Sequence, residues 1–139
     1  MKRIRLQPNA RPSRRRRGFQ SMELVMTLPI LGIVIFALFE FSMLFFARGA
    51  VVEASRVGAR MATLPGVDQA AIEEEIRKVL QPRLQENLQI DVQLGENTGD
   101  VVSVMVTVAA EEAAPNLLWP IGYSLEGEKL IAETRMIRE

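Results

Sequence analysis

The side chains of this sequence that could take part in chemistry are almost all carboxylates. The sequence contains no histidine and no cysteine, which excludes serine–histidine triads, cysteine nucleophiles and histidine-containing zinc sites. Acidic runs remain at Glu73 to Glu75 and at Glu111–Glu112. Adjacent acids point in different directions in a helix and to opposite faces in a strand. These runs therefore favour a solvated surface over a catalytic dyad, and we expect no enzymatic activity, no cofactor and no metal site.

Two other acids are notable because of an apolar run that extends from Leu24 to Ala47. Glu23 comes just before this run, and Glu40 is the one charged residue inside it. The run would measure roughly 36 Å as a helix, and about 20 apolar residues are enough to cross a bilayer core. A soluble helix of this length without a polar face would be unusual. The run therefore predicts a single membrane-spanning helix.

The charge distribution predicts the orientation of this helix. Eight of the 17 basic residues lie within residues 1–18, which contain no acid, and the rest of the chain holds nine basic against 17 acidic residues. Because Lys and Arg beside a span stay cytoplasmic, we expect a cytoplasmic N-terminus, near the anionic membrane lipid, and an extracytoplasmic C-terminal domain. Nucleic-acid binding is the rival interpretation of a basic run, but the span directly behind it makes topology the better explanation.

The basic leader ends at Gly18, where a cytoplasmic-face peptidase could reach the chain. An ordinary secretory signal has a shorter apolar region followed by small residues. Here Arg48 puts a charge where such a cleavage site would have to lie. Cutting before the apolar run, at Gly18, is the alternative. Glu23 would then be the fifth residue of the cut chain.

Gly18-Phe19-Gln20-Ser21-Met22-Glu23 resembles the processing motif of type IV pilin-like proteins. Over residues 14–63 the chain is similar to TadE-like pseudopilins of the tight-adherence (Flp) pilus system. Further positions carry residues like those of this family: Arg16–Gly18, Glu23, Leu28–Pro29, Glu40–Phe41, Ala54, Arg56 and Gly58–Arg60. Leu24 and Ser42 depart from the commoner Phe and Gly, which leaves the TadE-like and TadF-like subtypes open.

The resemblance implies a pilin-like, membrane-anchored minor subunit or assembly component of a bacterial tight-adherence pilus. It implies that a prepilin-type peptidase cuts between Gly18 and Phe19, and that Glu23 pairs with the free N-terminal amine of an adjacent subunit. Its partners would be other pilin-like subunits and the inner-membrane pilus assembly machinery. The alternative is an uncleaved bitopic membrane protein with an extracytoplasmic binding domain. Cleavage at Gly18 discriminates the two.

The pattern predicts an α+β fold in three parts: a basic leader at 1–18, a transmembrane and protruding helix at 19–64, and a small domain at 65–139. Within that domain, Asp68 is a plausible cap for an amphipathic helix over 69–81. Period-two alternation predicts three antiparallel strands. They cover residues 88–94, 101–108 and 130–137, with a hairpin turn at 96–100. A domain this small without a disulfide needs support, from the protruding helix or from neighbouring subunits.

Several residues of the long helix are candidates for packing or for a subunit interface. Pro29 predicts either an ordinary kink or a flexible joint. Glu40 would lie near the outer interface, either solvated or as a packing partner. Small residues four apart form a ridge on one face, which predicts packing on the chain's own sheet, on other subunits, or both. The ridge consists of Ala50, Ala54, Gly58 and Ala62.

The apolar, irregular segment 113–124 has two interpretations. It contains Trp119 and Tyr123 together with Pro115 and Pro120. It is either a buried crossover or a loop that touches the membrane surface, where Trp and Tyr are favoured.

Overall fold

The computed structural model describes residues 15–138, with side chains from residue 21 onward. The chain divides into two compact units, Met1–Val34 and Ile35–Glu139. The boundary falls inside the first helix, α1, which runs from Arg15 to Ala62. Most of the leader, residues 1–14, lies outside the described residues.

Helix α1 starts earlier and ends earlier than the predicted 19–64. Its first residues are arginines, which are good helix formers. Its end comes before Pro65, which disfavours helical conformation in the residue preceding it. Thr63 and Leu64 form a turn in which their N–H groups bond to Arg60 and Met61 carbonyls. The segment Ser21–Ala62 is long and apolar enough to cross a membrane.

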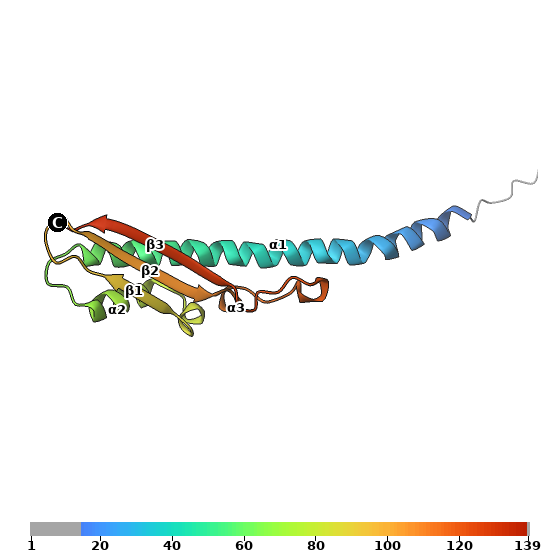
Figure 1. Ribbon diagram of the computed structural model, residues 1–139. Helices are drawn as coiled ribbons and strands as arrows, with labels where there is room; N and C mark the ends of the chain where they lie inside the picture. Colours follow the sequence, from blue (N-terminus) through green and yellow to red (C-terminus); the bar gives the residue numbers. More distant parts are fainter. Residues whose placement is uncertain (1–14, 139) are drawn as a thin grey trace, which may run out of the picture. The chain divides into compact units, whose positions relative to one another are not determined.

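The second unit contains a three-stranded antiparallel sheet (Figure 1), which confirms the predicted fold class. Its strands are β1 (Gln89–Gln93), β2 (Val101–Ala109) and β3 (Lys129–Ile137), in the order β1-β2-β3. Val104 of the central strand is the partner of Val92 on one side and of Thr134 on the other. This register places the even-numbered residues of all three strands on one face.

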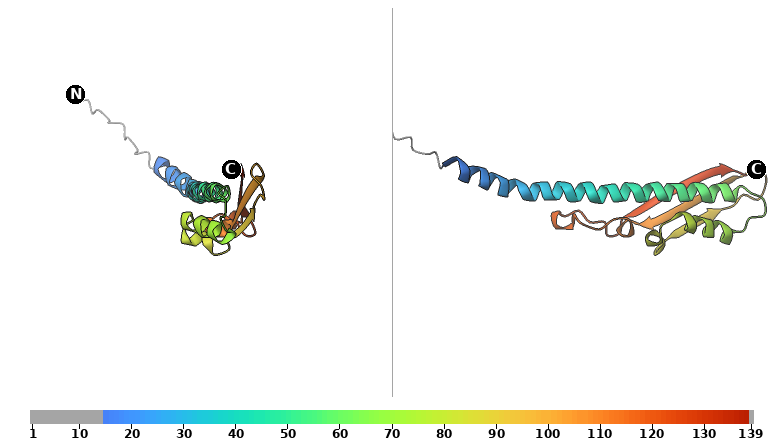
Figure 2. Two further views of the ribbon diagram at one scale, coloured as in Figure 1. Left: turned by 90° about the vertical axis from the view of Figure 1, so that its left-hand side faces the viewer. Right: turned by 180° about the vertical axis from the view of Figure 1, so that it is seen from behind.

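The sheet is covered on one face only. The even-numbered valines of β2, from Val102 to Val108, are 0 % exposed, whereas Val101 is exposed at the other face. Figure 2 shows the C-terminal part of α1 and helix α2 (Gln69–Val79) on the same side of the sheet. An antiparallel sheet with one packed and one solvated face gives the alternation seen in the sequence.

Helix α2 ends two residues before the predicted Gln81. Leu80 has an extended backbone, and a 3-10 turn, η1, follows at Pro82–Gln85. Proline restricts the residue before it to non-helical conformations, which accounts for the early end. Asp68 occupies the N-cap position, but its side chain makes no capping bond. Its backbone carbonyl instead accepts hydrogen bonds from the Ala71 and Ile72 N–H groups.

The solvent-exposed face of α2 carries two ion pairs that share Lys78. Lys78 lies 3.1 Å from Glu74, as its i,i+4 spacing predicts, and 3.3 Å from Glu75. Hydrogen bonds to these two carboxylates raise the pKa of Lys78 above its ordinary value. Glu73 accepts a hydrogen bond from Gln69 rather than pairing with Arg77 in the described part of the chain.

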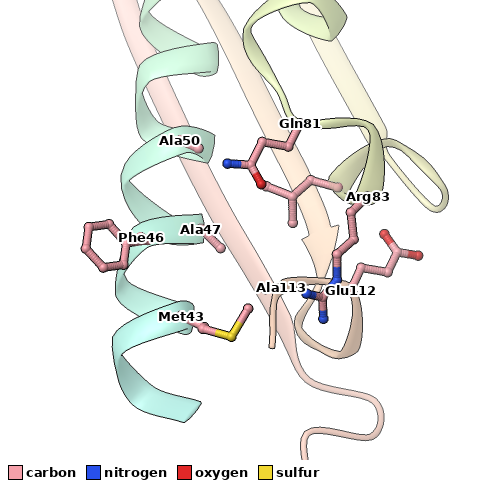
Figure 3. Close-up of a pocket in the computed structure, with 9 residues that line it drawn as sticks. Met43, Phe46, Ala47, Ala50, Gln81, Arg83, Glu112 and Ala113 are labelled. Carbon is pink, nitrogen blue, oxygen red and sulfur yellow. The ribbon is translucent and has the colours of Figure 1, made fainter. Parts of the chain in front are cut away.

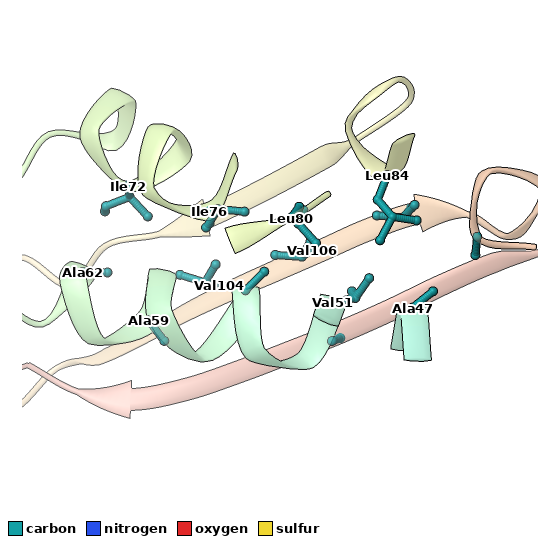
Figure 4. Packing of buried hydrophobic residues seen from close by; sticks show 14 of the residues in the cluster. Ala47, Val51, Ala59, Ala62, Ile72, Ile76, Leu80, Leu84, Val104 and Val106 are labelled. Atoms are coloured by element: carbon teal, nitrogen blue, oxygen red, sulfur yellow. The ribbon is translucent and has the colours of Figure 1, made fainter. Parts of the chain in front are cut away.

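The core lies where α1, α2 and β2 meet (Figure 4). Ile72 and Ile76 of α2 are 0 % exposed and pack over β2, and Ala59 and Ala62 of α1 complete the cluster. Gly58 permits this close approach. A Cβ added there would lie 2.6 Å from Ile76 Cδ1 and 3.1 Å from a methyl of Val104. The protruding end of α1 therefore supports the small domain by supplying part of its core.

Between β2 and β3 the chain forms a short helix, α3 (Ala110–Ala113), and then a loop that contains a 3-10 turn, η2 (Trp119–Ile121). We call residues 114–125 the Trp119 loop. The acids of α3 bind separate segments: Glu111 accepts a hydrogen bond from the Gly127 N–H, and Glu112 accepts bonds from Asn87. They point to different neighbours, as expected for adjacent acids in a helix.

Candidate functional site

Glu40 of α1 makes a buried polar contact between the long helix and a distant segment of the second unit. Its Oε2 accepts hydrogen bonds from the backbone N–H of Leu117 at 2.6 Å and of Leu118 at 3.1 Å. The residue is 0 % exposed. Its Oε1 is also buried and has no hydrogen-bond partner among the described residues. An unpaired buried polar group raises the free energy of the fold. The two N–H donors to Oε2 reduce this cost for the Glu40 carboxylate.

The local backbone of the Trp119 loop is what presents these two amides to Glu40. The N–H of Ile121 bonds to Leu118 and that of Gly122 bonds to Trp119, which closes the η2 turn. Gly122 has a φ of 91°, a left-handed conformation that glycine adopts without strain. The N–H of Leu118 has no acceptor within the described part of the loop, and the N–H of Leu117 lies 3.0 Å from the Pro115 carbonyl. Glu40 Oε2 is therefore the acceptor for Leu118 and a second acceptor for Leu117.

Apolar contacts hold the loop on both sides of Glu40. The rings of Phe41 and Tyr123 lie 5.6 Å apart in a tilted arrangement, which is a favourable geometry for an aromatic pair. Three buried loop and α3 residues form a separate small cluster with Met43 and Leu44 of α1. They are Ala110, Ala114 and Leu125.

The structure corrects the interpretation of Glu40 as a solvated charge. Glu40 is instead a packing partner within its own chain, and the groups that bind it lie 77 and 78 residues away in sequence. Backbone N–H groups carry no side-chain signature, so the sequence offered no way to pair them with Glu40. The one available signal was the charge itself, because an acid inside an apolar run must find a partner or water.

The small-residue ridge packs inside the second unit. Ala54 is 0 % and Ala62 is 3 % exposed, Gly58 is buried, and Ala50 is partly buried against the same core. The ridge residues therefore pack against the core of their own chain, as the first interpretation predicted. Their packing against other subunits stays a prediction.

A cleft of about 260 Å³ lies beside this ridge (Figure 3). Met43, Ala47 and Ala50 line it from α1, and Arg83 and Glu112 face them from η1 and α3. The Glu112 carboxylate is already engaged by Asn87. Because this lining holds no pair of a nucleophile and a base, we assign no chemistry to the cleft.

The expected processing segment lies at the start of α1 in the first unit. The bond between Gly18 and Phe19 falls within the helical backbone, but the side chains there are outside the described residues. Glu23 is exposed, and its carbonyl accepts a hydrogen bond from the Thr27 hydroxyl at 3.1 Å. Helix α1 continues through Pro29. Cleavage, the register role of Glu23 and the joint at Pro29 stay predictions.

The side chains that follow the expected cleavage site are mostly apolar and exposed. Every residue from Ser21 to Leu31 is exposed in the structure. A largely apolar helix that is exposed on all sides is the expected form of a segment that is surrounded by lipid or by other helices. This feature, with the long span, fits a membrane-anchored protein.

Comparison with known protein families identifies one match. The family described as TadE-like protein matches residues 18–60, a segment that begins at the expected cleavage site and ends near the end of α1. This finding confirms the resemblance to TadE-like proteins and suggests a pilin-like component associated with the tight-adherence pilus. Comparison with curated proteins and with solved structures gave no match.

Proposed function

We propose, from the TadE-like segment at residues 18–60, that this chain is a membrane-anchored, pilin-like minor subunit or assembly component of a tight-adherence pilus. The family match is the observation that carries the proposal. An exposed apolar helix and a small α+β unit supported by its C-terminal part are consistent with it.

The first part of the proposal is processing. A prepilin-type peptidase of the cytoplasmic membrane cuts between Gly18 and Phe19 and releases the basic leader. Glycine leaves the backbone unhindered at the scissile bond. The basic residues of the leader hold this bond at the cytoplasmic face.

The second part is subunit registration by Glu23. After cleavage, the carboxylate of Glu23 pairs with the N-terminal amine of an adjacent subunit. Glu23 is exposed in the structure, so it is accessible to such a partner. In a poorly hydrated helix bundle, an unpaired carboxylate or amine has a high free-energy cost. This cost favours the axial offset between neighbouring subunits that brings the two charges together.

Two variants test these two parts separately. Gly18→Trp should block cutting, because the bulky side chain crowds the peptidase site, whereas Gly49→Trp, at an open position of the same helix, should be cut normally. Glu23→Ala should be cut but should lose co-purification with other pilin-like subunits. Glu53→Ala, which removes a more distant exposed acid, should assemble like the wild type.

The plain-anchor alternative predicts a different pattern. An uncleaved bitopic protein would have the full mass in every variant, and Glu23→Ala would leave its associations unchanged. Normal cutting of Gly18→Trp, or normal assembly of Glu23→Ala, would therefore contradict the proposed mechanism.

A further inference from the structure

The Trp119 loop presents an exposed apolar surface in the second unit. Trp119 is 68 % exposed and Ile121 is 55 % exposed, and Tyr123 is also exposed. The chain carries no charge from Ala113 to Leu125. Large exposed apolar side chains gathered in a charge-free segment indicate a surface that meets something other than water.

The loop lies beside the C-terminal end of the apolar run of α1. Its contacts are with Glu40, Phe41, Met43 and Leu44, and Figure 1 shows it next to α1 beyond the end of the sheet. The next turn of α1 carries Phe45 and Phe46, which are 73 % and 81 % exposed. Arg48 is the first charge after them. Phe41 is 40 % exposed and contacts Tyr123, so the exposed apolar surface of the helix continues onto the loop at this pair.

From this placement we infer that the Trp119 loop lies in the interfacial layer of the lipid bilayer, where α1 leaves the membrane, with Trp119 and Ile121 inserted at the headgroup boundary. Trp and Tyr are the residues that favour this layer, because one end of each ring is apolar and the other is polar. The inference rests on the membrane anchoring in the proposed function, but not on cleavage or pilus assembly.

Lipid is favoured over a second protein copy by two observations. The exposed loop surface continues that of the apolar run of α1 instead of standing apart from it. Apart from Ser124, Asn116, the Tyr123 hydroxyl and the Trp119 indole N–H, the loop offers no polar side-chain groups and no charge, whereas protein interfaces usually have a polar rim around their apolar centre.

The same arrangement explains the contact between Glu40 and the loop. A carboxylate near the end of a span would otherwise face lipid, which is costly. The loop covers Glu40 completely and supplies two N–H donors to it. The loop therefore shields the acid from lipid, and the acid fixes the loop at the height of the interface.

Trp119 is the single tryptophan of the chain, so its fluorescence reports directly on this loop. The test uses the full chain reconstituted into phosphatidylcholine vesicles whose acyl chains carry bromine either near the headgroup or near the chain end. We expect blue-shifted emission that is quenched more strongly by the shallow bromines than by the deep ones. We also expect weak quenching by aqueous acrylamide.

Ile121→Asp and Ile131→Asp form a matched pair of variants, because both isoleucines are 55 % exposed. Ile131 lies on the open face of β3, away from the loop. Ile121→Asp should reduce the quenching by shallow bromines about twofold or more, since a charge is disfavoured at that depth. Ile131→Asp should leave the quenching unchanged and serves as the control for folding.

Other outcomes would overturn the inference. Full acrylamide access with no bromine quenching, in protein that floats with the vesicles, would place the loop in water while leaving membrane anchoring intact. Protection from both quenchers would show that protein covers the loop. Failure to float with vesicles would instead contradict the anchoring on which the proposed function also depends.

Discussion

The hydroxyl groups of Ser55 on α1 and Thr134 on β3 lie 2.7 Å apart, although the residues are 79 positions apart in sequence. Ser55 is 0 % exposed, and its hydroxyl also lies 2.9 Å from the Val52 carbonyl, to which it donates. Thr134 therefore donates to Ser55. This bond joins the long helix to the edge strand of the sheet.

Removing this hydroxyl should destabilise the second unit. Ser55→Ala leaves the half-buried Thr134 donor without its acceptor, and we expect a loss of about 1 kcal/mol in the free energy of unfolding. Ser103→Ala, on the open face of the sheet where the Ser hydroxyl is 3.4 Å from Gln93, is the control and should change stability little. Chemical denaturation in detergent micelles measures both; equal effects of the two variants would contradict this role.

Glu40→Ala should release the Trp119 loop. The change leaves the N–H group of Leu118 without an acceptor, at a cost of about 1–3 kcal/mol, whereas the N–H of Leu117 keeps the Pro115 carbonyl. We expect the amide hydrogen of Leu118 to exchange faster with solvent, while those of β2 stay protected. Glu126→Ala removes an exposed acid from the segment after the loop and should not change the exchange. Unchanged protection at Leu118 in Glu40→Ala would show that the carboxylate does not hold the loop.

Gly58→Ala and Gly49→Ala should change stability in opposite directions. A methyl at Gly58 meets Ile76 and Val104, which are both 0 % exposed and packed in the core. Overpacking costs about 1–3 kcal/mol, more than the helix propensity that alanine gains over glycine. Gly49 has no neighbour within 4 Å, so Gly49→Ala should stabilise the helix by about 0.5–1 kcal/mol. Thermal unfolding of the two variants in micelles gives the comparison, and stabilisation by both would contradict the packing at Gly58.

A reporter that is active only outside the cytoplasm, fused after Glu139, should be active. The expectation follows from the basic residues before the span and the acidic excess after it. A fusion that is expressed normally but inactive would contradict the orientation. Replacing the four consecutive arginines Arg14 to Arg17 with neutral residues should reduce the reporter activity, because it removes four of the eight basic residues that set the topology.

The sequence predicted the features that depend on local periodicity. Alternation over 101–108 identified the central strand and its buried valines, because side chains of a strand alternate between faces. Length and hydropathy identified the span. Proline positions marked the regions where α1 and α2 end, and the structure shifted those ends by two residues.

The contacts between distant segments could not be predicted in the same way. The Glu40 contact uses backbone amides of a loop whose conformation depends on the η2 turn and on Gly122. The bond between Ser55 and Thr134 joins two common residue types that have no distinguishing spacing. In both cases the sequence shows a polar group that needs a partner, and the fold decides which partner it finds.

The central claim, that this is a processed pilin-like subunit, is tested most directly by the intact mass of the membrane-extracted protein. The chain should be expressed in matched cells with and without an active prepilin-type peptidase. The account predicts that the protein from peptidase-containing cells lacks residues 1–18 and begins at Phe19, and that the protein from peptidase-deficient cells retains them. A chain of the same full mass from both cells would contradict the account and would favour the uncleaved membrane anchor.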